Sequence, residues 1–185
     1  NLSAEAVVGL CVYLTQLRET LKSDGGFPTM AVLDLSNNTA VTDAIVGSSL
    51  TRLVTLWVKV EVLNLSGTGI TGTGFLMLAP WASQGHVCEL YFQGLLHGLS
   101  FPEVLGFLTH IKRGGRYPAA RPGGQVNIPV PLWIRLDRNG IQGIEAIEGH
   151  FARGFRVAAL ADPIPDAPRS PGTMAVRLPF VYDQF

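Results

Sequence analysis

Apolar residues recur with one spacing in four separate segments of the chain. Each segment follows the pattern apolar-x-x-apolar-x-apolar-x-x, where x is any residue, and the ninth position is asparagine in two of the four. The segments begin at Met30, Val60, Val87 and Pro131. Apolar residues that alternate with other residues over about four to eight positions predict a short strand with one buried face. We therefore predict four strands that bury equivalent positions.

The distances between these segments predict a repeat with one insertion. Successive fourth positions are 30, 27 and 44 residues apart, so the third interval is the irregular one. Within it, residues 112–130 hold four glycines and three prolines, which predicts a loop. A near-constant interval with one long exception is typical of a repeat array that carries a local insertion.

Helical periodicity lies between the predicted strands. Leu50 and Leu53 share one apolar face after the first strand. After the third strand, Ser100 and Glu103 form a capping box, in which each residue satisfies a free backbone N–H group near the start of a helix. Residues 3–22 predict a helix at the N-terminus that would cover the first repeat.

Three segments carry a known motif: LDLSNN at residues 33–38, LNLSGTGI at 63–70 and IRLDRNGI at 134–141. They resemble the leucine-rich repeat family, specifically its long, helix-containing type, as in ribonuclease-inhibitor-like arrays. The resemblance covers roughly residues 30–160. It implies an α/β fold: a short solenoid with about four parallel strands on its concave face, helices on its convex face and the N-terminal helix as a cap.

The ninth position has a specific role in this resemblance. An asparagine there hydrogen-bonds backbone groups that would otherwise be left without partners as the chain leaves the strand. The resemblance gives this role to Asn38 and Asn139, with Thr68 as a weaker substitute. The third segment departs from the pattern, because Phe92 and Leu95 stand where leucine and asparagine are usual, and we expect that repeat to be irregular.

We divide the chain into two parts. Residues 1–160 form the leucine-rich-repeat-like domain, with 112–130 as its basic, glycine- and proline-rich insertion. Residues 161–185 contain five prolines and form either a strap over the end of the array, which we favour, or a linker. The chain starts at Asn1 without a signal-peptide pattern, so we expect a segment of a larger intracellular protein, cytoplasmic or nuclear.

Composition narrows the classes of function. Hydrophobic residues make up 47% of the chain and charged residues 15%, as in a packed globular protein. The net charge is zero, which argues against capture of nucleic acid or anionic membrane by the whole domain. No apolar stretch is long enough to span a membrane. Both cysteines, Cys11 and Cys88, lie in apolar runs and are interpreted as core thiols.

One stretch raises the alternative of a dinucleotide-binding enzyme. Gly67, Gly69 and Gly72 form a G-x-G-x-x-G motif directly after a predicted strand. Such a site also needs an acidic residue at the tip of the next strand, and Glu89 instead lies in the middle of one. We therefore interpret the glycines as a turn of the repeat. No catalytic, metal-binding or nucleotide-binding motif remains, so we expect a non-enzymatic protein without cofactor or metal.

Residues between the core positions would line the concave face and bind a partner. At its last two strands this face carries tyrosine, tryptophan and arginine, the residues that dominate binding hot spots. The predicted partner-binding residues are Tyr91, Gln93, Trp133, Arg135, Asp137 and Arg138. A second interpretation stays open, in which Trp133 packs under the insertion and Arg135 only pairs with Asp137.

The insertion suggests RNA as an alternative partner. Basic residues beside an aromatic ring and flexible glycines suit contact with a phosphate backbone and stacking on bases. The candidate residues are Lys112, Arg113, Arg116, Tyr117 and Arg121. The same composition also fits a solvated loop. We therefore predict a scaffold or adaptor module that binds another protein. The alternative is an RNA-binding module that uses the basic insertion together with the Trp133 and Arg135 end of the sheet, and we expect no membrane contact.

Overall fold

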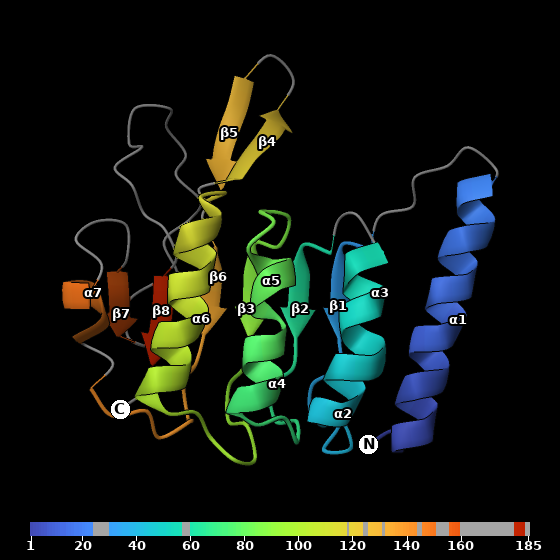
Figure 1. Cartoon of the computed structure of the whole chain (residues 1–185), viewed down its shortest axis with the longest axis horizontal. Coiled ribbons are helices and arrows are strands. Elements are labelled where there is room, and N and C mark those ends of the chain that lie inside the picture. The colour runs from blue at the N-terminus through green and yellow to red at the C-terminus, as the bar shows by residue number, and fades with distance from the viewer. Residues whose placement is uncertain are drawn as a thin grey trace.

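The computed structural model shows a mixed α/β architecture with an all-parallel main sheet (Figure 1). It describes residues 1–23, 30–56, 60–117, 119–123, 126–130, 132–143, 146–150, 156–159 and 180–183. All structural statements below concern these residues.

The four predicted strands lie side by side in chain order. They are β1 (Val32–Asp34), β2 (Val62–Asn64), β3 (Glu89–Tyr91) and β6 (Trp133–Arg135). Every neighbouring pair is parallel, and equivalent positions of the sequence pattern face one another across the sheet, as Leu33 does to Leu63 and Leu90 does to Ile134. The prediction of four parallel strands in one register is confirmed.

Two further strands extend the sheet beyond β6. β7 (Arg156–Ala159) and β8 (Phe180–Asp183) are both parallel to it, and the order is β1-β2-β3-β6-β8-β7. The strand from residues 161–185 is therefore inserted between β6 and β7. The rest of the segment predicted as a strap or linker, residues 161–179 and 184–185, lies outside the described residues.

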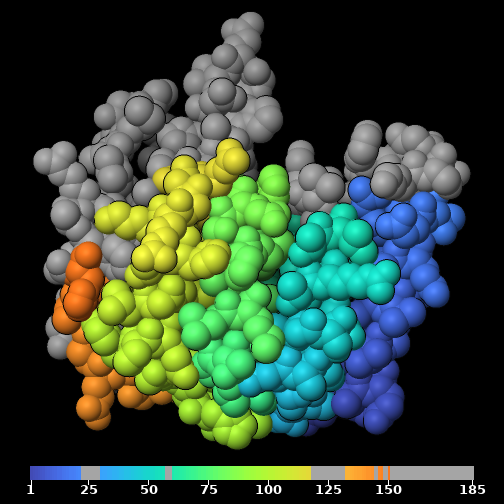
Figure 2. Space-filling view, viewed as in Figure 1, coloured from blue at the N-terminus to red at the C-terminus, as the bar shows by residue number. Residues whose placement is uncertain are grey.

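Helices run along one face of the sheet (Figure 1), and their side chains form a continuous surface (Figure 2). The helical elements are α1 (Ala4–Ser23), α2 (Asp43–Ile45), the π-helix η1 (Val46–Leu50), α3 (Thr51–Leu56), α4 (Gly72–Met77), α5 (Ala79–Ala82), α6 (Phe101–Gly114) and α7 (Ile147–His150). Within the described residues, no helix has both the length and the apolar character needed to cross a membrane.

The insertion is more ordered than the predicted loop. α6 continues through Lys112 and Arg113, and the chain then forms an antiparallel hairpin of β4 (Ala119–Gly123) and β5 (Val126–Val130). The prediction of a loop over residues 112–130 was wrong in this respect. Val126, Ile128 and Val130 supply the alternating β-branched residues that favour a strand, a signal that the glycines and prolines around them obscured.

The fourth and sixth positions of each repeat form the rungs of the core. All eight residues are buried: Leu33, Leu35, Leu63, Leu65, Leu90, Phe92, Ile134 and Leu136. Phe92, the irregular sixth position, has its ring centroid 4.9 Å from that of Phe75, which in turn stacks 4.3 Å from Phe107. The third repeat therefore keeps the strand position but fills it with a larger ring that two facing helices accommodate.

Polar side chains at the ninth position hold the turns that follow the strands. The Asn38 amide donates to the Leu35 carbonyl at 3.0 Å, and the Thr68 hydroxyl donates to the Leu65 carbonyl at 2.7 Å. Both bonds go to the sixth residue of the same repeat. The roles that the resemblance assigns to these two residues are therefore present in the structure.

Asn139 serves two repeats at once. Its amide nitrogen lies 2.7 Å from the carbonyl oxygens of both Leu136 and Phe92, and its Oδ1 accepts the backbone N–H of Leu95 at 3.0 Å. The third repeat has Leu95 and no asparagine at its ninth position, and its free backbone groups are satisfied by the asparagine of the next repeat. Because Asn139 is buried, these groups have no alternative partner in bulk water.

The eighth position of every repeat has a left-handed backbone. The φ angles are +58° at Asn37, +67° at Gly67, +56° at Gly94 and +65° at Arg138. Glycine and asparagine adopt this conformation most readily, which explains their presence at three of the four sites. The first glycine of the G-x-G-x-x-G motif is therefore a turn residue shared with the other repeats.

The last glycine of that motif lies where two helices meet. A Cβ atom on Gly72 would be 1.7 Å from Oε1 of Glu103, the capping-box residue of α6. Next to it, the Asp43 carboxylate accepts the backbone N–H of Thr71 at 2.8 Å and the Thr71 hydroxyl at 2.5 Å. Two carboxylates thus surround the start of α4, where a dinucleotide site would place its phosphates, and they would repel that ligand.

Replacing Gly72 with alanine should lower the free energy of unfolding by about 1–3 kcal/mol, because the methyl group displaces Glu103 from the α6 cap. Gly9→Ala is the matched control: Gly9 lies in α1 with open space around its Cβ position, and alanine should stabilise that helix by up to about 1 kcal/mol. Urea denaturation followed by circular dichroism measures both. Equal effects of the two substitutions would contradict the packing role of Gly72.

Candidate functional site

The face of the sheet opposite the helices carries the candidate site. In β2, β3 and β6 the central residue is buried and the two flanking residues are partly exposed, since strand side chains alternate between faces. The parallel register sets the flanking residues side by side across the strands, so that the third positions Glu89 and Trp133 are neighbours, as are the fifth positions Tyr91 and Arg135.

Hydrogen bonds connect the fifth positions of the first two strands. The Asn64 amide donates to Oδ2 of Asp34 at 3.1 Å, and the backbone N–H of Ser36 donates to Oδ1 at 2.9 Å. Partial burial acts to raise the pKa of Asp34, but these hydrogen bonds from Ser36 and Asn64 outweigh it, and the pKa lies below its ordinary value. Asp34 is therefore a fixed negative charge on this part of the face.

Tyr91 is the best-positioned aromatic side chain of the site. Its hydroxyl donates to Oε2 of Glu89 at 2.5 Å, and the Arg135 guanidinium carbon lies 5.8 Å from its ring centroid. Burial, the hydrogen bond to Glu89 and the negative charge of Glu89 together raise the pKa of Tyr91 to about 12, against a smaller opposing effect of Arg135. The ring is thus held between a carboxylate and a cation.

The contacts of Tyr91 predict that its phenol ionises at a higher pH than an ordinary tyrosine. Tyr91→Phe should remove one phenol that ionises near pH 12 from the four tyrosines of the chain, as measured by phenolate absorbance after a rapid alkaline pH jump. In the unfolded chain this phenol ionises at its ordinary value near 10. Its contribution to stability is therefore complete below pH 10 and is lost as the pH rises towards 12. A lost component with a midpoint near 10 would contradict the Glu89 contact.

Asp137 supports this site from below the surface. It is buried, its Oδ2 accepts a short hydrogen bond from the Gln93 amide, and Nε of Arg135 lies 3.6 Å from its Oδ1. The prediction that Asp137 contacts a partner was wrong, because its side chain has almost no exposed surface. The pairing of Arg135 with Asp137, which the sequence left open, is present and holds the guanidinium next to Tyr91.

The remaining predicted residues flank this group. Trp133 is partly exposed and lies beside Glu89 in the register, while Arg138 is exposed at its left-handed turn. Glu89 belongs to the site although the sequence did not single it out. The signal was present, since Glu89 and Tyr91 are two residues apart in a strand and therefore share a face.

Of the residues predicted for RNA, the structure describes three as exposed and one as buried. Lys112, Arg113 and Arg116 are exposed, the first two in the last turn of α6. Tyr117 is buried, with its hydroxyl 2.9 Å from the carbonyl oxygen of Ala82 and 2.7 Å from that of Val87, so its predicted stacking on a base was wrong. Arg121 lies in β4, and its side chain is outside the described part.

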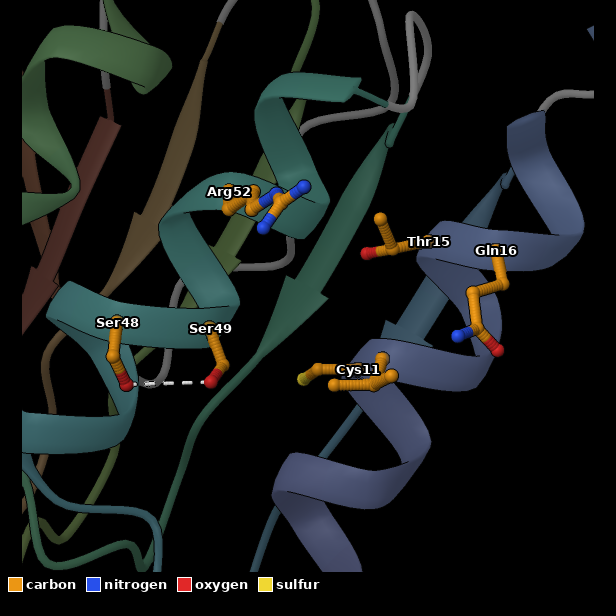
Figure 3. Close-up of a pocket in the computed structure, with 7 residues that line it drawn as sticks. Cys11, Thr15, Gln16, Ser48, Ser49 and Arg52 are labelled. Carbon is orange, nitrogen blue, oxygen red and sulfur yellow. Dashed lines mark hydrogen bonds between the residues drawn. The ribbon is translucent and has the colours of Figure 1, made fainter.

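A shallow cleft lies between α1 and the η1–α3 segment (Figure 3). It measures about 220 Å³ and is lined by Cys11, Val12, Thr15, Gln16, Ser48, Ser49 and Arg52. Cys11 and Cys88 are both buried, as predicted, and burial raises the pKa of the Cys11 thiol. Nothing in this lining pairs a nucleophile with a base, and the described residues contain no cluster of histidine, cysteine or acidic side chains that would hold a metal.

Comparison of the sequence with models of protein families gives no match, and comparison with curated proteins gives none either.

Proposed function

We propose that this chain is a non-enzymatic protein-interaction module, a scaffold or adaptor that binds another protein through the open face of β3 and β6. The observation that carries this proposal is the restrained group of Tyr91 and Arg135 on that face. The shared register of the strands supports a short leucine-rich-repeat-like solenoid with this face as its concave surface.

Restraint of these side chains favours tight binding. Glu89 fixes the Tyr91 hydroxyl, and Asp137 fixes the Arg135 guanidinium, so neither loses much rotational freedom when a partner docks. Tyrosine, tryptophan and arginine also supply the largest contact areas per residue and a polar group at their ends. Trp133, partly exposed beside them, would extend this contact.

The charges of the face favour a protein over RNA. Asp34 and Glu89 lie on it together with Arg135, and such a mixture of signs suits a polypeptide surface, whereas a phosphate backbone requires an excess of cations. The exposed Lys112 and Arg113 have a structural role that needs no ligand, since cations in the last turn stabilise a helix through its dipole. RNA binding through α6 remains the alternative.

Two variants distinguish these functions. The triple variant Tyr91→Ala, Trp133→Ala, Arg135→Ala should lose most of its protein partners, by about tenfold or more in quantitative affinity capture, because a few anchor residues carry most binding energy. The matched control, Lys112→Gln, Arg113→Gln, Arg116→Gln, changes three exposed residues at the end of α6 and should retain those partners.

The reverse pattern would favour RNA. If only the glutamine variant loses its ligand, and that ligand is single-stranded RNA bound with a steep dependence on salt, the interaction is electrostatic and the sheet-face proposal is wrong. A normally folded alanine variant that keeps every partner would also reject the proposal. Circular dichroism of both variants establishes that each is folded.

A further inference from the structure

The outer edge of β1 ends the sheet on its N-terminal side. β1 is the first strand in the sheet order and pairs only with β2 among the described residues. α1 nevertheless continues the row of helices past β1 (Figure 1), and within the described part no strand lies beneath it. The helical layer therefore extends further in this direction than the sheet does.

α1 packs as the helix of a repeat would. It contacts α2, η1 and α3, as α2 and η1 contact α4 and α3 contacts α5. Its core side is formed by buried Val7 and Cys11. Val12 and Tyr13 are nevertheless exposed by 48% and 61%, so the outer surface of α1 is partly apolar, whereas a terminal cap usually presents a polar one. Arg18 of this helix is buried, and its Nε and Nη1 have no hydrogen-bond partner among the described residues, which is costly.

One hydrogen bond of Asn38 is equivalent to a hydrogen bond that Asn139 makes with the repeat before it. Oδ1 of Asn139 accepts the backbone N–H of Leu95, the ninth residue of the preceding repeat. Oδ1 of Asn38 accepts the backbone N–H of Leu2 at 2.7 Å, so Leu2 occupies the place of a ninth residue. Ser3 then opens α1 as an N-cap, with its hydroxyl accepting the N–H of Ala6 at 3.2 Å.

Asn38 lacks the second hydrogen bond that Asn139 makes with the repeat before it. Asn139 also donates to the carbonyl of Phe92, the sixth residue of the preceding repeat. Asn38 has no such neighbour and instead donates to the Ser36 carbonyl of its own turn at 3.1 Å. The group that is lacking is therefore a backbone carbonyl at the end of a strand beside β1.

We propose that the outer edge of β1, together with the underside of α1, is a docking surface for one further polypeptide strand, parallel to β1 and carrying the apolar pattern of the repeat. Continuity of the ladder sets the direction, because every strand of this sheet is parallel to its neighbours. Its fourth and sixth residues are apolar and pack beneath α1. Its fifth residue lies beside Asp34 and is a hydrogen-bond donor, as Asn64 is on the other side.

The chain itself supplies the probe. A copy of residues 60–66 (VEVLNLS) fused directly before Asn1 places its leucines at the fourth and sixth positions, an asparagine donor at the fifth and Leu2 at the ninth. The fused protein should unfold at higher urea concentration than the chain of residues 1–185, and amide hydrogen exchange in β1 should slow by about tenfold or more. The control is the same fusion with both added leucines replaced by serine, which keeps the length but removes the apolar pattern.

Two results would overturn this proposal. One is a fusion whose unfolding midpoint and β1 exchange match those of the serine control, which would show that added length and not a docked strand is responsible. The other is an edge already protected in the unmodified chain by self-association, seen as slow β1 exchange that depends on protein concentration. The free VEVLNLS peptide should slow β1 exchange as well, at millimolar concentration, whereas the fused copy needs no added peptide.

Discussion

Replacing Phe92 with alanine should lower the free energy of unfolding by about 3–5 kcal/mol. Phe92 is fully buried, and its ring contacts the ring of Phe75 edge-on. The ring of Phe107 stacks on that of Phe75. Removing the ring leaves a cavity between strand β3 and the helices above it, and the rigid neighbours cannot collapse to fill it. Urea denaturation monitored by circular dichroism measures the change.

The informative comparison is Phe92→Leu, which gives the third repeat the leucine that the other three repeats carry at the sixth position. If regularity of the pattern determined stability, this substitution would be neutral or favourable. We expect it to destabilise by about 1 kcal/mol, because the packed rings around position 92 require the larger side chain. A stabilised Phe92→Leu variant would contradict the role assigned to the aromatic cluster.

Asn139→Ala should lower the free energy of unfolding by about 2–4 kcal/mol, since it removes a buried amide that satisfies three backbone groups. The carbonyls of Phe92 and Leu136 and the N–H of Leu95 all lose their side-chain partner. Because these groups belong to two repeats, hydrogen exchange should accelerate at Leu95 as well as near residue 139, and this is the measurement that tests the shared role.

Thr68→Val is the matched control for this prediction. Thr68 is also buried at a ninth position, but its hydroxyl makes one hydrogen bond, to the Leu65 carbonyl within its own repeat. The expected loss is about 1 kcal/mol, with no effect on the neighbouring turn. If Thr68→Val were as destabilising as Asn139→Ala, the bonds that Asn139 makes to the preceding repeat would contribute nothing.

The local pattern of the chain predicted the strands well. Alternation within a strand depends on side chains two residues apart, and this relation is contained in any window of a few residues. The near-constant spacing of Leu33, Leu63 and Leu90 then sufficed to predict their alignment across the sheet. The resemblance implied the role of the ninth-position asparagines, and this role is local as well, since the Asn38 side chain bonds a backbone group three residues away.

Burial of polar and aromatic side chains was not predictable in this way. Tyr117 lies in a basic, glycine-rich segment, yet its hydroxyl bonds carbonyls 35 and 30 residues away in sequence. Asp137 occupies the seventh position of its repeat, which the sequence pattern places on the exposed face. It is nevertheless buried and bonded by the Gln93 amide of the neighbouring repeat. In both cases the partner comes from another part of the chain, so no local window contains the information that decides exposure.

The glycines that resembled a nucleotide-binding loop show the same division. The sequence alone determined that Gly67 occupies the eighth position of a repeat, a turn position that favours a left-handed backbone. Only the tertiary structure decided that Gly72 has Glu103 against it and that Asp43 bonds Thr71 next to it. These contacts join helices of three successive repeats, and their distances follow from how the helices pack.

The sequence by itself thus determined the repeat, its strands and their register, because those depend on near neighbours and a period. The tertiary structure decided which polar groups are exposed and what fills each helix start, because those depend on residues brought together from distant parts of the chain.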